Sequence, residues 1–141
     1  MNYAKISDAL RPEAWGDTRT GTLVETARKG LSYSVARRLA DENGLAAWSM
    51  DKLTGSSART MQRKKSADRE LSKAELSNLF EVVRVSQDAA STLGSLEKAM
   101  RWMESPIMSL GGERPLHLMD TPMGRRRVTQ VLGRIRHGIH G

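Results

Sequence analysis

The sequence has 141 residues, no cysteine and a formal net charge of +7 at neutral pH, and its length suits one ordinary domain or two small ones. Without cysteine, disulfides, thiolate metal sites and cysteine catalysis are excluded, and without a signal peptide or a long apolar run we expect a cytosolic protein with no membrane segment. The positive charge favours a polyanion such as nucleic acid, or an acidic protein, as the partner.

The basic residues gather in two groups along the chain. The first group contains no acidic residue and consists of Arg59, Arg63, Lys64 and Lys65. The second group follows the last acidic residue, Asp120, and consists of Arg125, Arg126, Arg127, Arg134 and Arg136. These two segments are where we expect an anionic partner to bind.

Residues 1–20 show no sustained periodicity, so we expect an arm that is ordered only where it docks on the rest of the protein. Residues 22–29 predict a first helix, and Gly30 is expected to end it. Ser32 or Ser34 then provides the N-cap of a second helix, because a serine hydroxyl can accept a hydrogen bond from an unpaired backbone N–H group.

The second helix has apolar residues at the i, i+3 and i+4 spacing of a single helical face. These residues are Val35, Ala36, Leu39 and Ala40. Asn43 and Gly44 are expected to end this helix, and residues 45–53 predict a third helix that stops at the Thr-Gly-Ser sequence around Gly55.

A turn at Gly55 connects the third helix to a fourth, SSARTMQRKK, for which Ser56 or Ser57 can serve as the N-cap. Two helices joined by a short turn that contains glycine form the helix-turn-helix arrangement. We therefore assign residues 21–70 to a helix-turn-helix DNA-binding domain.

The fourth helix has the side chains that reading DNA in the major groove requires. Ala58 and Met61 are expected to face inward, while Arg59, Gln62 and Arg63 share the opposite side. Arginine pairs with guanine, glutamine pairs with adenine, and the two lysines that follow can neutralise phosphates. The same residues could instead form the solvated face of a helical bundle. The predicted DNA-binding residues are Ser57, Arg59, Thr60, Gln62, Arg63, Lys64 and Lys65.

A capping box, Ser72 to Glu75, begins the next helix, which extends to about Gly94. Leu71 and Leu76 flank the box and can form a hydrophobic staple. Its apolar stripe is either core or the seam of a homodimer. The stripe consists of Leu76, Leu79, Phe80, Val83 and Ala90. We assign residues 71–94 to a linking and dimerisation helix.

Ser95 caps a further helix, LEKAMRWMES, which Pro106 ends and whose apolar face includes Trp102. The passage LGGERPLHLMDTPMG follows at residues 110–124. Its glycine pair suits a sharp turn or a close approach of another backbone, and each proline suits the first turn of a helix.

The last predicted helix begins after the N-cap Thr121, runs from Pro122 to about His137 and stops at Gly138. Its apolar ridge lies between arginines, and such a ridge normally docks on the protein's own core. Its basic side suits DNA or an acidic groove of a partner equally well. The sequence shows no strand-like alternation, so we predict an all-α protein.

From Ala99 to Gly138 the chain resembles the toxin-binding domain of Xre/MbcA/ParS-type antitoxins. The shared elements are a tryptophan helix, a proline, a Leu-Gly-Gly run, a Pro-Leu-x-Leu turn, a Thr-x-x-Gly helix start and a terminal Leu-x-Arg-Ile-x-x-Gly. Residues 54–66 and 71–83 are similar to the family's Xre-like helix-turn-helix and linking helix. The chain departs from the family pattern at Asp51, Thr54 and Ser56, where small or apolar residues are usual.

The resemblance implies a type II antitoxin with an N-terminal Xre-like helix-turn-helix domain and a small helical toxin-binding domain at residues 95–141. Such antitoxins typically bind a RES-domain toxin that destroys NAD and occlude its active-site entrance. Many also dimerise and repress their own operon. The implied partners are the cognate toxin, operator DNA and a second copy of the chain, and we expect no enzymatic activity, cofactor or metal.

The resemblance also implies a role for the passage at residues 110–124, which would hold the final helix at one angle so that its ridge reaches into the toxin. The predicted toxin-binding residues are Trp102, Leu110, Gly111, Gly112, Pro115, Leu118, Thr121, Gly124, Val128, Leu132, Ile135, Arg136 and Gly138.

Two other classes of function remain open at the level of sequence. The first is a DNA-binding regulator without a toxin, whose C-terminal module would dimerise or sense a ligand. The second is an enzyme. Its acid–base candidates are His117, His137, His140, Asp120 and Glu113, but neither a nucleophile nor a Gly-rich phosphate loop accompanies them. His137 and His140 do not make a metal site by themselves.

Overall fold

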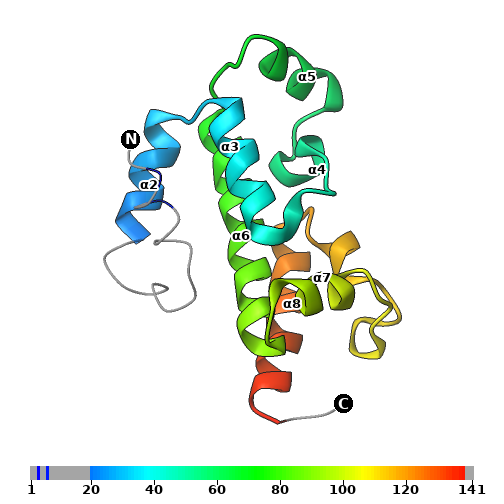
Figure 1. Cartoon of the computed structure of the whole chain (residues 1–141). Coiled ribbons are helices and arrows are strands. Elements are labelled where there is room, and N and C mark those ends of the chain that lie inside the picture. Colours follow the sequence, from blue (N-terminus) through cyan, green and yellow to red (C-terminus); the bar gives the residue numbers. More distant parts are fainter. Residues whose placement is uncertain (1–2, 4–5, 7–19, 139–141) are drawn as a thin grey trace. The chain divides into compact units, whose positions relative to one another are not determined.

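The computed structural model describes Tyr3, Ile6 and residues 20–138 of the chain (Figure 1). The elements within this described part are helices, with no β-strand and a single isolated bridge between Ser32 and Glu70. The predicted all-α class is therefore confirmed. The chain divides into two compact units, Met1–Arg84 and Val85–Gly141.

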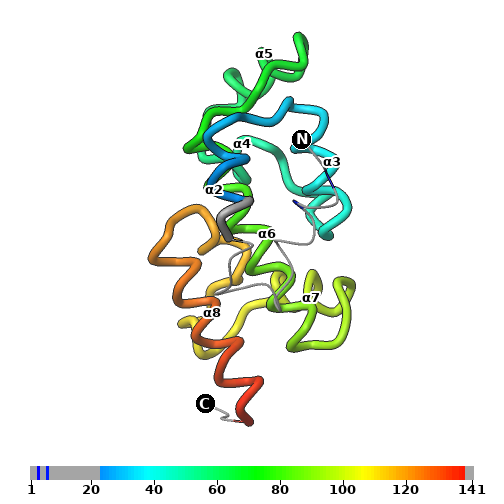
Figure 2. Tube along the Cα trace, turned by 90° about the vertical axis from the view of Figure 1, so that its left-hand side faces the viewer, coloured from blue at the N-terminus to red at the C-terminus, as the bar shows by residue number. Residues whose placement is uncertain are grey.

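The first unit is made of short helices and the beginning of a long one. Its elements are α2 (Thr20–Lys29), α3 (Tyr33–Ala40), the π-helical turn η2 (Asp41–Leu45), α4 (Met50–Thr54), α5 (Ala58–Ser66) and the start of α6 (Lys73–Leu93). Figure 2 traces the path from α5 through a short loop into α6.

Local capping sets the first two helices as predicted. Gly30 has a φ of +90° and ends α2. The Ser32 hydroxyl accepts a hydrogen bond from the Val35 N–H at 3.4 Å, so Ser32 rather than Ser34 caps α3. Three of the four residues predicted for the inner face of α3 are buried: Ala36, Leu39 and Ala40.

The prediction of one continuous helix over residues 45–53 is wrong. Gly44 has a φ of +83° and turns the chain, Ser49 adopts an extended conformation, and α4 begins only at Met50. The bend lets Leu45 and Trp48 reach the core, where their exposed fractions are 0% and 7%. Burial of these two large side chains outweighs the loss of a few helical hydrogen bonds.

Arg37 satisfies the carbonyl groups that this bend frees. Its guanidinium donates from Nη1 to the Trp48 carbonyl oxygen at 2.8 Å and from Nη2 to the Leu45 carbonyl oxygen at 2.9 Å, while Nε donates to Asp41 at 2.8 Å. Buried carbonyls without a partner are costly, and the fork of an arginine side chain can serve two at once. The bend is thus stabilised by a residue from α3, outside the segment that bends.

Two residues of the expected N-terminal arm belong to the described part. Ile6 is 1% exposed. The Arg38 guanidinium carbon lies 4.1 Å from the centre of the Tyr3 ring, and the Tyr3 hydroxyl donates to the Glu42 carboxylate. Burial, together with that carboxylate, raises the pKa of Tyr3 to about 12. The rest of residues 1–19 lies outside the described part, so the prediction of an arm is not tested there.

The long helix α6 begins with the predicted capping box. The Glu75 N–H donates to the Ser72 hydroxyl at 3.2 Å, and the Ser72 N–H donates to Glu75 Oε1 at 2.7 Å. Four residues of its apolar stripe are 0% to 4% exposed within the single chain: Leu76, Leu79, Phe80 and Val83. These residues are therefore core, and a homodimer seam would have to use other residues.

The second unit consists of the end of α6 and four further elements. They are α7 (Leu96–Met103), the 3-10 turns η3 (Met108–Leu110) and η4 (Pro115–Leu118), and α8 (Pro122–Arg136). Both 3-10 turns contact α8, and η4 also contacts α7. The buried core of these elements consists of Ala99, Met103, Leu110, Met119, Val128, Val131 and Leu132.

Candidate functional site

The predicted turn between α4 and α5 is confirmed. Gly55 has a φ of +78° and its N–H donates to the Asp51 carbonyl oxygen at 2.9 Å. Ser57 caps α5 by accepting a hydrogen bond from the Thr60 N–H at 3.1 Å. Among the residues of α5, all of which the structure describes, only Met61 is buried. The prediction that Ala58 faces inward is wrong, because this first helical residue beside the turn is exposed.

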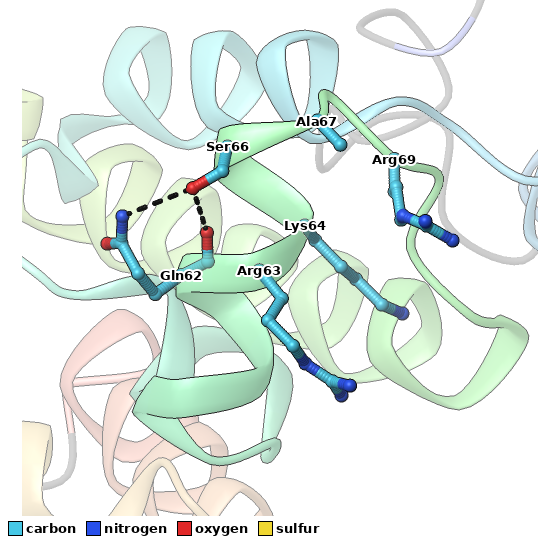
Figure 3. Close-up of a pocket in the computed structure, with 6 residues that line it drawn as sticks. All are labelled: Gln62, Arg63, Lys64, Ser66, Ala67 and Arg69. Carbon is cyan, nitrogen blue, oxygen red and sulfur yellow. Dashed lines mark hydrogen bonds between the residues drawn. The ribbon is translucent and has the colours of Figure 1, made fainter.

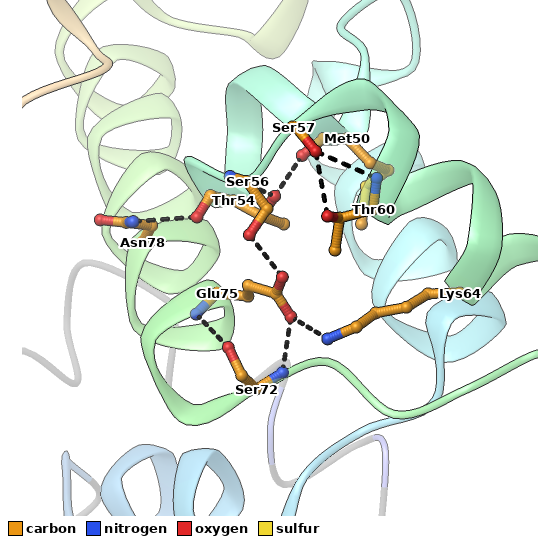
Figure 4. Close-up of polar contacts among 9 residues, drawn as sticks. All are labelled: Met50, Thr54, Ser56, Ser57, Thr60, Lys64, Ser72, Glu75 and Asn78. Carbon is orange, nitrogen blue, oxygen red and sulfur yellow. Dashed lines mark hydrogen bonds and ion pairs between the residues drawn. The ribbon is translucent and has the colours of Figure 1, made fainter.

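A buried carboxylate organises the surroundings of this turn (Figure 4). Glu75 is 4% exposed, and its Oε1 atom accepts hydrogen bonds from Lys64 Nζ at 2.5 Å and from the Ser72 N–H at 2.7 Å. Its Oε2 atom accepts from the Ser56 hydroxyl at 2.5 Å. We call these four residues the Glu75 cluster. The cluster connects the turn, α5 and the beginning of α6 through one side chain.

The Glu75 cluster keeps its carboxylate ionised. Burial raises the pKa of Glu75, but the hydrogen bonds from Lys64, Ser56 and the Ser72 backbone, with the positive charge of Lys64, outweigh burial and lower the pKa to about 2. The side chains of Glu75 and Lys64 are 6% and 20% exposed, so solvent screens this ion pair much less than a surface pair.

Polar residues at the turn, where the resembled family usually has apolar ones, are bonded within the first unit. Thr54 is 2% exposed, and its hydroxyl donates to the Met50 carbonyl oxygen at 2.6 Å. The Asn78 side chain donates to the Thr54 carbonyl oxygen at 2.9 Å. Ser56 belongs to the Glu75 cluster. Hydrogen bonds to α6 thus take the place of apolar packing around the turn.

The cluster changes the interpretation of Lys64. The sequence predicts that Lys64 neutralises a DNA phosphate, but its ammonium group is paired with Glu75 inside the unit. Thr60 is half-buried, and its hydroxyl lies 3.0 Å from that of Ser57. The other predicted DNA-binding residues lie exposed on α5 and its cap: Ser57, Arg59, Gln62, Arg63 and Lys65.

A cleft of about 490 Å³ lies at the end of α5, lined by Gln62, Arg63, Lys64, Ser66, Ala67 and Arg69 (Figure 3). The side chains of Arg63, Lys64 and Arg69 extend on the same side of α5. The Arg69 backbone is fixed, because its N–H donates to the Lys64 carbonyl oxygen and its carbonyl oxygen accepts from the Tyr33 N–H, both at 2.8 Å. Our sequence prediction missed Arg69, although the basic run continues past Ala67.

In the second unit, residues 107–113 form a tightly bonded loop. The Ile107 N–H donates to the Glu113 carbonyl oxygen at 3.1 Å, and the Gly112 N–H donates to the Ile107 carbonyl oxygen at 3.0 Å. Gly111 and Gly112 have φ values of +69° and +82°, and a Cβ atom on either would meet no atom within 4 Å. The glycine pair therefore serves a sharp turn rather than a close approach of another backbone.

The start of α8 is packed directly against η4. Thr121 caps α8 by accepting a hydrogen bond from the Gly124 N–H at 3.0 Å. A Cβ atom on Gly124 would overlap the carbonyl oxygen of Leu118 and lie 2.8 Å from its carbonyl carbon. The 8% exposed Arg125 donates to the Met119 carbonyl oxygen at 2.9 Å. Gly124 therefore has no room for a side chain beside η4.

The predicted contact ridge of the last helix needs correction. Val128 and Leu132 are 0% exposed, and Ile135 is half-buried. Val128 and Leu132 fill the core of the second unit, where burial within the chain satisfies them without a partner. These two residues therefore position α8 and are not available to contact a toxin, whereas the contact predicted for Ile135 stays a prediction.

The other predicted toxin-binding residues fall into three groups by exposure. The buried ones are Leu110, Pro115 and Gly124, which shape the unit from inside. Trp102 and Leu118 are half-buried. The exposed ones are Gly111, Gly112, Thr121, Arg136 and Gly138. Among these, Arg136 donates to Asp88 at 2.6 Å and to Thr92 at 2.9 Å, which fastens the end of α8 to α6 within the second unit.

The side of α8 away from this core carries a row of residues that were not among the predicted toxin-binding residues, although the sequence predicts that the basic side of this helix suits DNA or an acidic groove of a partner. The row, which we call the outer face of α8, consists of Met123, Arg126, Arg127, Gln130 and Arg134. All five are exposed and follow one another at helical spacing. The positions opposite the apolar ridge on a helical projection of residues 122–136 identify this face from the sequence.

Two of the histidines considered for acid–base chemistry, His117 and His137, are exposed, while His140 lies outside the described residues. Within the described part, no group of three or more His, Asp or Glu side chains is placed to hold a metal ion. No helix of that part is long and apolar enough to span a membrane.

Comparison with known proteins places the second unit in a described family. Residues 88–138 match the model of the antitoxin Xre/MbcA/ParS C-terminal toxin-binding domain. A protein from Yersinia enterocolitica serotype O:8 named antitoxin Xre is 30% identical over 124 residues, which cover 86% of this chain and 83% of that protein. A second antitoxin Xre, from Photorhabdus laumondii subsp. laumondii, is 28% identical over 112 residues, covering 79% of this chain and 76% of that protein.

Proposed function

This chain belongs to the Xre-type antitoxin family, and from that premise we propose that it neutralises a RES-domain toxin that degrades NAD. Neutralisation would occur by binding: residues 88–138 dock on the toxin and cover the entrance to its active site. The antitoxin itself would then need no catalytic group.

The observation that best supports this proposal is the fit of Gly124 against the Leu118 carbonyl group, where no side chain can be added. Together with the Thr121 cap and the Arg125 hydrogen bond to Met119, it holds η4 and α8 in one arrangement. A rigid element loses less conformational entropy on binding than a flexible tail. Such an element suits a protein that must block a site sterically.

The test is co-expression with the neighbouring reading frame, followed by affinity purification, size exclusion and measurement of cellular NAD. We expect a stoichiometric complex, growth arrest with NAD loss when the toxin is expressed alone, and recovery of both when the antitoxin is added. A complex whose toxin has no effect on NAD would support the antitoxin function but contradict the proposal that the toxin degrades NAD. Purification of the chain alone would favour a DNA-binding regulator without a toxin.

We further propose that α5 binds operator DNA and that the protein represses its own operon as a homodimer. Arg59, Arg63 and Lys65 are exposed on α5, and the Glu75 cluster fixes that helix relative to the turn before it. Exposed arginines on a helix of fixed orientation are suited to contact base edges in the major groove. Gel-shift titrations with operator and scrambled DNA, together with the mass of the free and bound protein, test both statements.

A further inference from the structure

The outer face of α8 is a charged surface that the fold itself does not use. The 15-residue helix contains five arginines and no acidic residue. Arg125 and Arg136 are engaged with Met119 and Asp88. The remaining three, Arg126, Arg127 and Arg134, make no ion pair with any residue that the structure describes.

On α2, α3 and α7, some cations are paired with acids four residues away, whereas the exposed cations of α5 are not. Such pairs join Lys29 to Glu25 at 2.8 Å, Arg38 to Glu42 at 3.0 Å and Arg101 to Glu97 at 3.5 Å. On α8 no acidic residue lies three or four positions from any of the three free arginines. The pairing seen on α2, α3 and α7 is therefore missing on α8, as it is on the exposed side of α5.

Two of these arginines gain no stabilisation from the helix dipole, whereas Arg134, in the last turn, is favourably placed. Arg126 and Arg127 lie in the second turn of α8, close to the positive end of the helix dipole, and the first turn has no acidic residue to offset them. Neighbouring cations repel one another as well. Arg126 and Arg127, which pair with no acid of the described part and gain nothing from the dipole, are explained by an acidic partner rather than by folding.

An apolar anchor stands at the beginning of the same face. Met123 is 71% exposed and is one of three exposed large apolar side chains of the described part, beside Val24 and Met108. Its backbone is fixed by the Thr121 cap and the close fit of Gly124. A flexible thioether on a rigid backbone can fill an apolar pocket in a protein partner, whereas the phosphate backbone of DNA has no such pocket.

We propose that the outer face of α8 is the surface that docks on the toxin, and that the toxin presents there an acidic patch beside an apolar pocket for Met123. This proposal rests on the toxin-binding function proposed above and gives the chemistry of its contact. The face lies within the residues that match the toxin-binding family model.

The experiment compares two charge reversals of equal size in the second unit. The variant Arg126→Glu with Arg127→Glu changes the outer face, and the control Lys98→Glu with Arg101→Glu changes two exposed cations of α7. Each is purified as the full chain, its fold is checked by circular dichroism and thermal unfolding, and its affinity for the toxin is measured by calorimetry. We expect the outer-face variant to bind the toxin about 100-fold more weakly and the control to remain within about 3-fold of the unmodified chain.

Met123 is tested separately, with Met123→Ser and the apolar variant Met123→Leu. We expect serine to weaken toxin binding about 10-fold and leucine to retain it, since only leucine can fill an apolar pocket. Equal weakening by both charge reversals, or unchanged toxin affinity in a folded outer-face variant, would overturn the proposal. Loss of operator binding with toxin affinity intact would assign the face to DNA instead. If the unmodified chain captures no toxin at all, the proposed function fails first and the docking proposal fails with it.

Discussion

Helices α5 and α8 are both basic, both begin at a serine or threonine cap, and both follow a tight turn, but they are positioned by different forces. In α5, Met61 alone is buried, and the orientation of the helix depends on the ion pair of Lys64 with Glu75. In α8, apolar residues are buried along its length, and Gly124 sits against the backbone of η4. One basic helix is held mainly by charge and the other mainly by shape.

This contrast indicates how each helix should respond to change. A helix held by charge is sensitive to pH and to removal of a single carboxylate. A helix held by shape is insensitive to pH but has no tolerance for added volume. The predictions below separate the two cases, beginning with the largest expected effect.

The largest effect is expected from Gly124→Ala. Its Cβ atom would overlap the Leu118 carbonyl oxygen, which belongs to the backbone and cannot move aside as a flexible side chain could. We expect the second unit to lose about 3 kcal/mol of stability and toxin binding to fall with it, while DNA binding by α5 is kept. Urea unfolding and the two binding assays measure this.

The matched control is Gly133→Ala, in the same helix. A Cβ atom there would meet only Arg136 Nη2, at 3.7 Å. Because alanine favours a helix over glycine, this variant should be more stable by about 0.5–1 kcal/mol. Similar behaviour of the two alanine variants would show that shape does not position α8.

A somewhat smaller effect is expected from Glu75→Gln. The amide keeps the size of the side chain but leaves Lys64 charged and mostly buried without its partner. We expect a loss of about 2–3 kcal/mol, together with weaker discrimination between operator and scrambled DNA. Adding Lys64→Gln to this variant should recover part of the stability. If the double variant is no more stable than the single one, the ion pair is not what holds α5.

The pH dependence of stability follows from the pKa of Glu75, which the cluster lowers from 4.5 to about 2. A carboxyl group whose pKa is lower in the folded state stabilises the fold fully above its unfolded pKa, and loses this contribution as pH falls through its folded pKa. Stability should therefore fall by up to about 3 kcal/mol between about pH 5 and pH 2. Urea midpoints across this range should fall steeply for the unmodified chain and less steeply for Glu75→Gln.

The smallest effects concern single contacts of α5 with DNA. Arg59→Ala or Arg63→Ala should each cost about 1–3 kcal/mol of operator affinity and relax the preference at one base position. Lys65→Ala should weaken operator and scrambled DNA alike, because a phosphate contact carries no sequence information. Titrations with both DNAs distinguish these results. Unchanged operator affinity in both arginine variants would reject α5 as the reading helix.

Features that depend on neighbouring residues could be predicted from the sequence. The Ser32, Ser57, Ser95 and Thr121 caps, the Ser72 to Glu75 capping box and the turns at Gly55 and Gly111 each involve only a few consecutive residues. Their hydrogen bonds are local, so residue type and spacing place them to within two residues, and the structure decides between Ser32 and Ser34 and between Ser56 and Ser57.

Features that depend on distant residues could not be predicted. The break before α4 is stabilised by Arg37, which bonds carbonyls eight and eleven residues further along the chain. The acid that pairs with Lys64 is Glu75, eleven residues away across a loop. Spacing along a helix cannot show this pair, so the sequence predicts a DNA phosphate as the partner of Lys64. Periodicity also showed that Val128 and Leu132 share a face of α8, but it could not show that their own chain covers that face.

The fit of Gly124 against Leu118 has a consequence in genetic terms. Every amino acid other than glycine has a Cβ atom, so each missense change of codon 124 leads to the same overlap. At most positions some single-base changes yield a similar side chain, and such changes persist in a population. Here none does, and a cell that also carries the toxin gene would be left without protection by any of them. Under selection for survival beside the toxin, we therefore expect codon 124 to remain invariant while codon 133, in the same helix, accumulates substitutions.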